Sequence, residues 1–234
     1  MREAVLLLVV AKAPVAGLAK TRLAPAIGAK NAAGLAAAAL LDTVDSVRAV
    51  PGTRPVVALT GDLSSAERAP ELTEALRGCT VLPQRGDDFG DRLANAHADV
   101  AERYPGLPVL QIGMDTPQVR PELLTGAIVR LLEDGAEAVL GPAADGGWWA
   151  LGLRQPTDAR VLRAVPMSRS DTGSRTLFAL RGIGRRVRRL PTLSDVDTMA
   201  DALRVAALAP ESRFARAFAN LDHWLPRQLA EANR

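Results

Sequence analysis

Short apolar runs alternate along the chain with longer segments in which apolar residues recur every three or four positions. Apolar runs flanked by turn residues predict buried strands, and the 3.6-residue period predicts amphipathic helices. The predicted strands are Ala4–Val10, Pro55–Thr60, Thr80–Pro83, Pro108–Ile112, Ala136–Leu140, Trp148–Leu153 and Arg186–Leu190. The predicted helices are Asn31–Val50, Ser64–Leu76, Asp91–Tyr104, Pro121–Glu133, Asp171–Leu180 and Thr198–Leu208. Ser64 followed by Glu67 has the spacing of a capping box, which places the start of the second helix at Ser64.

Strands that alternate with helices predict an α/β protein of three layers, a mostly parallel sheet covered by helices on both faces. Residues 136–153 break the alternation, because two strands are joined by Gly-Pro-Ala-Ala-Asp-Gly-Gly with no helix between them. This segment predicts one antiparallel excursion in the sheet. No internal repeat or low-complexity linker divides the chain. We therefore expect a single domain over residues 1–234, with residues 212–234 as a C-terminal helical tail.

Composition narrows the class of protein. The chain has 234 residues, of which 48% are hydrophobic and 24% charged, and its net charge of +3 does not by itself favour nucleic acid or a membrane as partner. Cys79 is the single cysteine, which excludes an intrachain disulfide and a thiolate metal cluster. His97 and His223 lie far apart in the sequence, and each is expected on the surface or in helix packing. The first apolar run stops at Lys12, too early for a membrane span, so a cytoplasmic protein is expected.

The loop that follows the first predicted strand carries a concentration of basic side chains. Three of the 29 basic residues are lysines, and two of them, Lys12 and Lys20, lie in this loop together with Arg22. Ligands of open α/β sheets bind beyond the carboxyl ends of strands, where backbone N–H groups, lysines and an arginine fork suit phosphates. Gly17 would let the backbone approach a ligand. The spacing matches neither a Walker A loop nor a dinucleotide fingerprint, and an ordinary polar loop is the alternative.

Two aspartates from distant loops predict a metal site at the same edge. Asp115 follows the strand that ends at Ile112, and Asp197 follows the last predicted strand. Carboxylates converging there form an oxygen-rich site suited to Mg²⁺ or Mn²⁺, which would bridge phosphate oxygens. The alternative is that Asp195 and Asp197 cap the helix beginning at Thr198.

The turn of the predicted hairpin suggests an acceptor pocket. Gly146 and Gly147 would leave room for a substrate, Asp145 would bind its hydroxyl or amine groups, and Trp148 would form an apolar wall. A plain turn with tryptophans in the core is the alternative interpretation.

Four motifs in chain order resemble the nucleotide-diphospho-sugar transferase superfamily, which has a GT-A-like Rossmann-type fold. They are Lys12–Leu23, Gly113–Pro117, Gly141–Gly147 and Asp195–Thr198. Together they are similar to a bacterial family of uncharacterised glycosyltransferase-like proteins, and the first loop also resembles that of phospholactate guanylyltransferase. The single Asp115 departs from the Asp-x-Asp of many glycosyltransferases, and this difference leaves the acceptor open.

The resemblance implies residue roles as well as a fold. It implies that the first loop holds the phosphates of a nucleotide, that Asp115 and Asp197 hold Mg²⁺, and that a Gln-plus-Gly segment after the third strand binds the base. The residues assigned to the nucleotide are Ala11, Lys12, Gly17, Lys20, Thr21, Arg22, Gln84 and Gly90. Those assigned to catalysis are Lys20, Arg22 and Asp115.

We therefore expect a Mg²⁺-dependent nucleotidyltransferase that couples an NTP to a small phosphorylated or phosphonate acceptor and releases pyrophosphate. Lys20 and Arg22 would stabilise the transition state electrostatically. A glycosyltransferase using a nucleotide diphosphate sugar is one alternative, and a non-catalytic nucleotide-binding protein is another. The base, the acceptor and the oligomeric state, a homodimer included, stay open.

Overall fold

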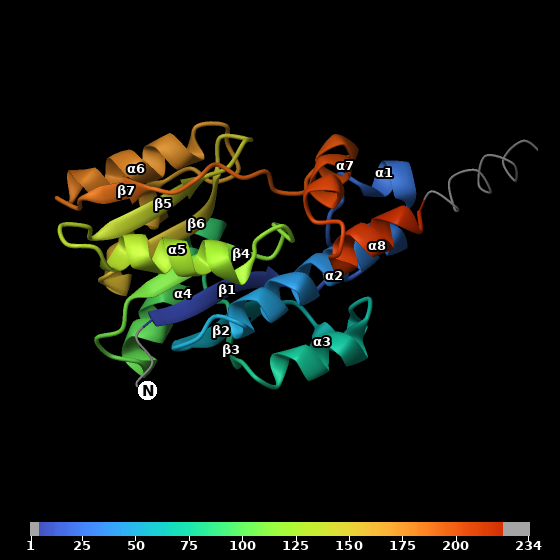
Figure 1. Cartoon of the computed structure of the whole chain (residues 1–234), viewed down its shortest axis with the longest axis horizontal. Helices are drawn as coiled ribbons and strands as arrows, with labels where there is room; N and C mark the ends of the chain where they lie inside the picture. The colour runs from blue at the N-terminus through green and yellow to red at the C-terminus, as the bar shows by residue number, and fades with distance from the viewer. Residues whose placement is uncertain (1–4, 222–234) are drawn as a thin grey trace, which may run out of the picture.

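A computed structural model describes residues 5–221, which form a seven-stranded sheet in the order β3-β2-β1-β4-β6-β5-β7 (Figure 1). The strands are β1 (Val5–Lys12), β2 (Thr53–Thr60), β3 (Thr80–Pro83), β4 (Val109–Gly113), β5 (Ala138–Pro142), β6 (Trp148–Leu153) and β7 (Val187–Arg189). Each one overlaps a predicted strand. The predicted helical tail lies partly outside the described residues, which end at Leu221.

The sheet is mostly parallel, as predicted. β1 pairs in parallel with β2 and β4, and the other parallel pairs are β2 with β3 and β5 with β7. β6 runs antiparallel to both β4 and β5, because the short β5–β6 connection turns the chain straight back. The predicted antiparallel excursion is therefore confirmed.

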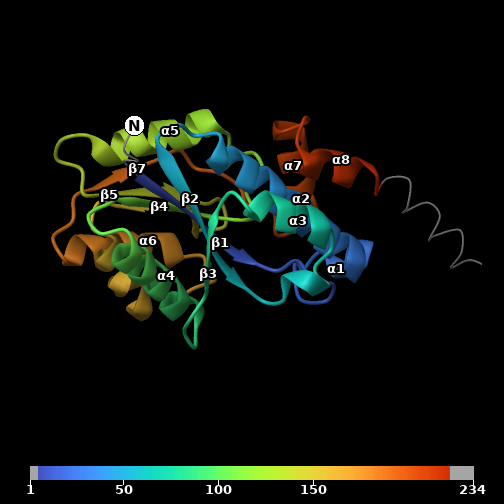
Figure 2. The ribbon, with the colours of Figure 1, turned by 90° about the horizontal axis from the view of Figure 1, so that it is seen from below.

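Helices cover both faces of the sheet (Figure 2). One face packs against α2, α3 and α5, and the other against α4, α6 and the 3₁₀ segment η2. The helical elements are α1 (Ala24–Ile27), α2 (Ala29–Arg48), η1 (Leu63–Ser65), α3 (Ala69–Leu76), α4 (Phe89–Arg103), α5 (Pro121–Leu132), η2 (Pro156–Ala164), α6 (Thr172–Gly182), α7 (Met199–Leu208) and α8 (Arg213–Ala219). The predicted three-layer α/β/α class is confirmed.

β1 is the centre of the fold because it is apolar on both faces. All of its residues except Lys12 are buried, and alternate side chains enter the two core clusters on opposite sides of the sheet. A strand covered on both faces has to be apolar throughout, which is the pattern expected of a central parallel strand. This burial fixes the point at which the chain leaves the sheet and begins the lysine-containing loop.

A third cluster of buried side chains lies beside the sheet, where α1, α7 and α8 pack on the first half of α2 (Figure 1). Leu23 at the end of the first loop and Val196 before α7 both belong to it. Asp42 of α2 accepts hydrogen bonds from the backbone N–H groups of Arg213 and Phe214, at 2.9 and 2.8 Å, and so anchors the start of α8. This cluster holds together two loops that are more than 170 residues apart in the sequence.

The predicted capping box at Ser64 is wrong. Asp62 accepts the Ser64 backbone N–H at 2.9 Å and caps only the short η1, and α3 begins at Ala69. Pro70 explains the difference, because a proline fits the first turn of a helix and would break the interior of one that began at Ser64. Two helical elements, α1 and η2, were not predicted from the sequence. Among the described residues, no helix has both the length and the apolar content needed to cross a bilayer.

Candidate active site

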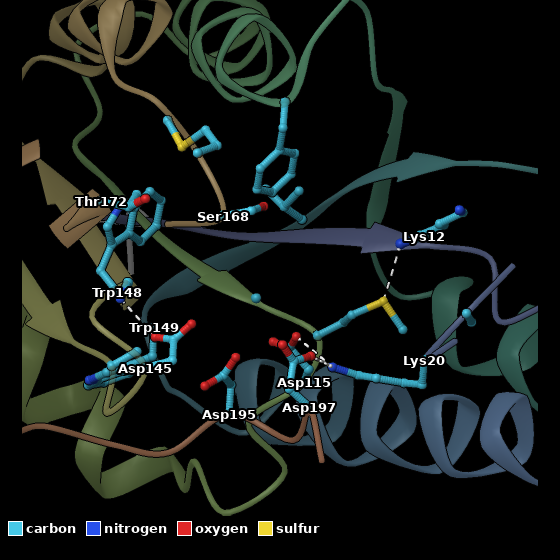
Figure 3. A pocket seen from close by; sticks show the side chains of 18 of the residues that line it. Lys12, Lys20, Asp115, Asp145, Trp148, Trp149, Ser168, Thr172, Asp195 and Asp197 are labelled. Atoms are coloured by element: carbon cyan, nitrogen blue, oxygen red, sulfur yellow. Dashed lines mark hydrogen bonds and ion pairs between the residues drawn. The ribbon is translucent and has the colours of Figure 1, made fainter. Parts of the chain in front are cut away.

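A cavity of about 730 Å³ opens at the carboxyl ends of β1 and β4, where five of the predicted loops meet (Figure 3). It lies where ligands of open α/β sheets bind. The residues assigned from sequence that line it are Lys12, Lys20, Thr21, Arg22, Gln84, Asp115, Asp145, Gly147, Trp148 and Asp197. Ala11, Gly17, Gly90 and Gly146 lie outside its lining.

The first loop brings Lys20 to the two predicted metal ligands. Its ammonium group lies 2.9 Å from Asp115 Oδ2 and 3.3 Å from Asp197 Oδ1, and its side chain is only 12% exposed. Arg22 reaches Asp197 Oδ2 at 2.8 Å with a side chain that is 70% exposed. Lys20 thus pairs with both carboxylates from a largely buried position, whereas Arg22, which pairs with Asp197 alone, is mostly exposed to solvent.

A backbone contact at Val196 brings the acidic loops together. The Val196 N–H donates to the carbonyl oxygen of Asp115 at 3.0 Å, and its side chain is buried in the third cluster. The chain bends at Val196, and with this residue anchored both Asp195 and Asp197 line the cavity. Carboxylate oxygens of Asp115, Asp195 and Asp197 lie within 4.8 Å of one another.

Asp195 therefore joins the two aspartates assigned to metal from sequence. It had been considered only as a helix cap, and the Asp-x-Asp spacing with Asp197 was the signal for its part in the cluster. The helix-cap alternative is wrong for this pair, because Thr198 caps α7 in a reciprocal capping box with Asp201.

The electrostatics of the cluster favour a cation. Burial, together with the nearby charges of Asp115, Asp145 and Asp197, raises the pKa of Asp195 to about 6. Burial alone would lower the pKa of Lys20, but attraction to Asp115 and Asp197 outweighs it, and the net pKa is raised. Three mutually repelling carboxylates are the hard oxygen donors that Mg²⁺ and Mn²⁺ take, so these residues fit a divalent ion.

Gln84 lines the cavity next to β1 with a fixed orientation. Its side-chain nitrogen donates to the carbonyl oxygens of Ala11 at 2.8 Å and of Ala58 at 2.9 Å. Since both partners only accept, the amide cannot be flipped, and its oxygen is left to accept from a ligand. Ala11 therefore contributes to the site through its carbonyl group.

Two glycines assigned to the nucleotide have other structural roles. Gly17 has φ of +80° with open space around the position of a Cβ, so its loop conformation requires glycine. A Cβ on Gly90 would lie 2.5 Å from the carbonyl oxygen of Leu162, so Gly90 permits the close packing of α4 on η2. Their part in nucleotide binding stays a prediction.

The hairpin turn is built around Asp145. Its Oδ1 accepts the N–H of Gly147 at 2.8 Å. Gly146 has φ of +92°, and a Cβ there would lie 1.9 Å from the carbonyl oxygen of Ser170, so the turn packs tightly on the loop before α6. Asp145 and Gly147 line the cavity, whereas Gly146 supports it from outside.

An irregularity in β6 separates the two tryptophans. Gly141 pairs with Ala150 and Pro142 with Trp148, so Trp149 is an extra residue on the β6 side. This bulge sends Trp149 into the core on the α2 and α5 side, where it donates to the Pro191 carbonyl oxygen at 2.9 Å. Trp148 faces the opposite side, lines the cavity and donates to Thr176 Oγ1 at 3.2 Å. Both tryptophans line the cavity, but Trp149 belongs mainly to the core, whereas Trp148 is only partly buried.

Several cavity residues were not assigned to the site from the sequence. They come from the start of α4, from the middle of β4 and from the loop before α6, and include Phe89, Arg92, Gln111, Met167, Ser168, Arg169 and Thr172. No motif connects these positions, because the fold alone brings α4 and the residue 167–172 loop over the same face of the sheet.

Solved structures of transferases share the fold. A protein from Desulfovibrio desulfuricans named as a candidate nucleotide-diphospho-sugar transferase superimposes with a TM-score of 0.82 and 24% identity, over 97% of this chain and 98% of that one. The synthetase for CMP-2-keto-3-deoxy-manno-octonic acid, solved with CTP, gives a TM-score of 0.57 at 14% identity, over 89% of this chain and 99% of that one. At these identities the likeness establishes the fold.

The sheet and its helical layers have the fold of these transferases, and the curated relatives are transferases as well, so the protein is a transferase. A relative from Nocardia farcinica, a phosphoenolpyruvate guanylyltransferase, is 31% identical over 202 residues, which are 83% of this chain and 82% of the relative. The chain belongs to the family described as "Uncharacterized protein conserved in bacteria (DUF2064)", which matches residues 43–169.

Proposed function

We propose that the protein is a Mg²⁺-dependent nucleotidyltransferase that couples GTP to a small phosphorylated acceptor, with phosphoenolpyruvate as the first acceptor to test. The observation that carries this proposal is the convergence of Lys20 and the carboxylates of Asp115, Asp195 and Asp197 in one cavity. The names of relatives at 31% and 35% identity supply the base and the acceptor. Because NTPs are found in the cytoplasm, we expect the enzyme to act there.

In the proposed reaction a phosphate oxygen of the acceptor attacks the α-phosphorus of the NTP. The bond between the α-phosphorus and the bridging oxygen breaks, and pyrophosphate leaves with the electron pair. Lys20 and Arg22 would offset the negative charge that builds up on the phosphoryl oxygens. A divalent ion held by the three aspartates would add charge neutralisation at the same oxygens.

Gln84 supports guanine as the base. Because its amide nitrogen is occupied by the Ala11 and Ala58 carbonyl groups, only its acceptor oxygen is available to a ligand. Guanine presents N1–H and N2–H donors on one edge, which complement such an acceptor. Phe89, which lines the cavity and is 47% exposed, offers a ring on which a base can stack.

Pyrophosphate release tests the proposal. Wild-type protein with Mg²⁺ would be incubated with each of the four NTPs, with and without phosphoenolpyruvate, and GTP with the acceptor should give the highest rate. Asp115→Asn and Asp197→Asn should abolish release while circular dichroism stays unchanged, and Asp134→Asn, an exposed position away from the cavity, should retain it. Turnover of a UDP- or GDP-sugar with no pyrophosphate from any NTP would instead establish the glycosyltransferase.

A further inference from the structure

A buried histidine and a buried glutamine form a pair beneath the cavity. His97 of α4 is fully buried, and its Nε2 lies 2.8 Å from Oε1 of Gln111 in β4. Within residues 5–221, His97 Nδ1 has no hydrogen-bond partner. Gln111 is 2% exposed and lines the cavity from the middle of its strand. A polar side chain placed in the central strand of a sheet, away from the strand end, needs a partner on its free side.

The protonation of His97 decides what Gln111 offers to the cavity. Burial lowers the pKa of His97 to about 4, so the ring is neutral near pH 7. With the proton on Nε2 the ring donates to Gln111 Oε1 and leaves only an unpaired acceptor at Nδ1. If the Gln111 amide were flipped, its nitrogen would donate to Nε2 and the ring proton would lie on Nδ1. That buried N–H would have no partner, which costs more than an unpaired acceptor. The amide nitrogen of Gln111 therefore faces the cavity, and no described residue accepts its hydrogens.

Because Gly113 has no side chain, a strip of β4 backbone lies uncovered between Gln111 and the acidic cluster of Asp115, Asp195 and Asp197. We call this backbone the bare strip. Side chains two residues apart on a strand share a face, so Gly113 lies next to Gln111 at about 7 Å along the strand. A Cβ on Gly113 would lie 2.7 Å from Asp115 Oδ1, which places that carboxylate over the same face. Val10 pairs with Gly113 in the neighbouring strand and also lines the cavity.

The walls around this strip are partly apolar, with Trp148 and Met167 as their large apolar side chains. Trp148 and Thr172 stand on one side, across the cavity from Lys20 and Asp115, and Ser168 lies between Trp148 and Lys12 in this view (Figure 3). Met167 lines the same side as Trp148 and packs with it against the core cluster. Inside such walls an unpaired amide donor is strongly favourable to an oxygen of a bound ligand.

We propose that the strip from Gln111 to Asp115 is the acceptor subsite and takes a phosphorylated carboxylic acid of a few carbon atoms. The acid's carboxylate or carbonyl oxygen accepts from the Gln111 amide, and its phosphate lies at the acidic cluster. His97 is a positioning residue, because it touches only Gln111 and holds the amide with its N–H groups toward the cavity. This inference rests on the proposed function, since it assigns part of that site to the second substrate.

Calorimetric titration of the Mg²⁺-loaded protein, with a non-hydrolysable GTP analogue present, tests the subsite. The ligands are phosphoenolpyruvate, 3-phosphoglycerate and, as a probe without a carboxylate, inorganic phosphate. We expect at least one of the two acids to bind wild type more than tenfold tighter than inorganic phosphate. Gln111→Met should remove that advantage and leave the affinity for the GTP analogue within twofold. Gln155→Leu, at an exposed position outside the cavity, is the matched control.

Two further variants separate positioning from folding. His97→Gln can still donate to Gln111 and should keep acid binding within threefold, whereas His97→Leu should lose it like Gln111→Met. Gln111→Met that binds the acids as wild type does would overturn the subsite, and wild type that prefers neither acid over inorganic phosphate would overturn the ligand class. The proposed function fails by a different result, the absence of pyrophosphate release from every NTP.

Discussion

Lys20 Nζ lies 2.9 Å from Asp115 Oδ2, so the loop after β1 supplies a cation to the carboxylate that follows β4. The same ammonium group lies 3.3 Å from Asp197, and Lys20 holds a φ of +47° that non-glycine residues rarely adopt. A strained backbone is retained where the surroundings over-determine it, and here the surroundings are two carboxylates from distant parts of the chain. Lys20 therefore pairs with the same carboxylates that would hold a metal ion.

Removing the ammonium group should strengthen metal binding in the absence of nucleotide. Lys20→Met leaves Asp115 and Asp197 without their internal cation, so Mg²⁺ should raise the Tm of the variant by more than it raises that of wild type. Pyrophosphate release should fall by roughly 100-fold or more, the scale for loss of one preorganised charge-stabilising group. Lys30→Met, at an exposed lysine outside the cavity, serves as control. An unchanged Mg²⁺ shift in Lys20→Met would show that the lysine and the metal do not compete.

Asp195 should make the metal-free protein less stable as the pH rises. Its pKa is about 6 in the folded state against 3.8 ordinarily, so between about pH 4 and 6 the folded state holds a proton that the unfolded chain has lost. Stability from this group is present below that window and is lost above it. In EDTA, the Tm of Asp195→Asn relative to that of wild type should rise between pH 4 and 6, and the variant should have the higher Tm at pH 7.5. With saturating Mg²⁺ the order at pH 7.5 should reverse, whereas Asp134→Asn should follow wild type throughout.

The strands and the three-layer class were predictable because they depend on local sequence. Val5–Lys12 is apolar at every position but the last, and a strand buried on both faces requires that run. The turn from Gly141 to Gly147 is too short to hold a helix, so the antiparallel β6 followed directly. The position of Asp115 and Asp197 in the cavity was predictable because each comes after a strand, and their part in metal binding stays a prediction.

The contacts that complete the candidate site could not be predicted from local sequence. Lys20 meets Asp115 across 95 positions and Asp197 across 177, and the meeting depends on Val196 being buried by α7, α8 and α2. The bulge at Trp149, which places the two tryptophans on opposite faces of the sheet, depends on the pairing of β6 with β5. In the sequence Gln111 is only one polar residue in an apolar strand, and its pairing with His97 becomes visible only in the structure.

His97 should make the folded protein sensitive to acid. Its pKa is about 4 when folded and 6.5 ordinarily, so from about pH 6.5 down to 4 the unfolded chain takes up a proton that the folded state refuses. The stability that the neutral imidazole contributes is therefore fully present above pH 6.5 and is lost as the pH is lowered toward 4. Urea unfolding at pH 7 and pH 4.5 should give a loss for wild type that exceeds the loss for His97→Gln by about 2 kcal/mol. Equal losses would mean that the imidazole is protonated in the folded protein.

Gly113→Ala should disable the site and spare the fold. The added Cβ would meet Asp115 Oδ1 at 2.7 Å, so the carboxylate has to move away from Lys20 and Asp197. The Mg²⁺-dependent rise in Tm should shrink, and pyrophosphate release should fall by roughly 100-fold, as expected when a metal ligand is displaced by about 1 Å. Gly126→Ala is the matched control, because a Cβ there meets nothing within 4 Å in α5 and should raise stability by about 0.5 kcal/mol. Gly113→Ala with full activity would show that Asp115 reaches the substrate from another rotamer, and the bare strip would then have no catalytic meaning.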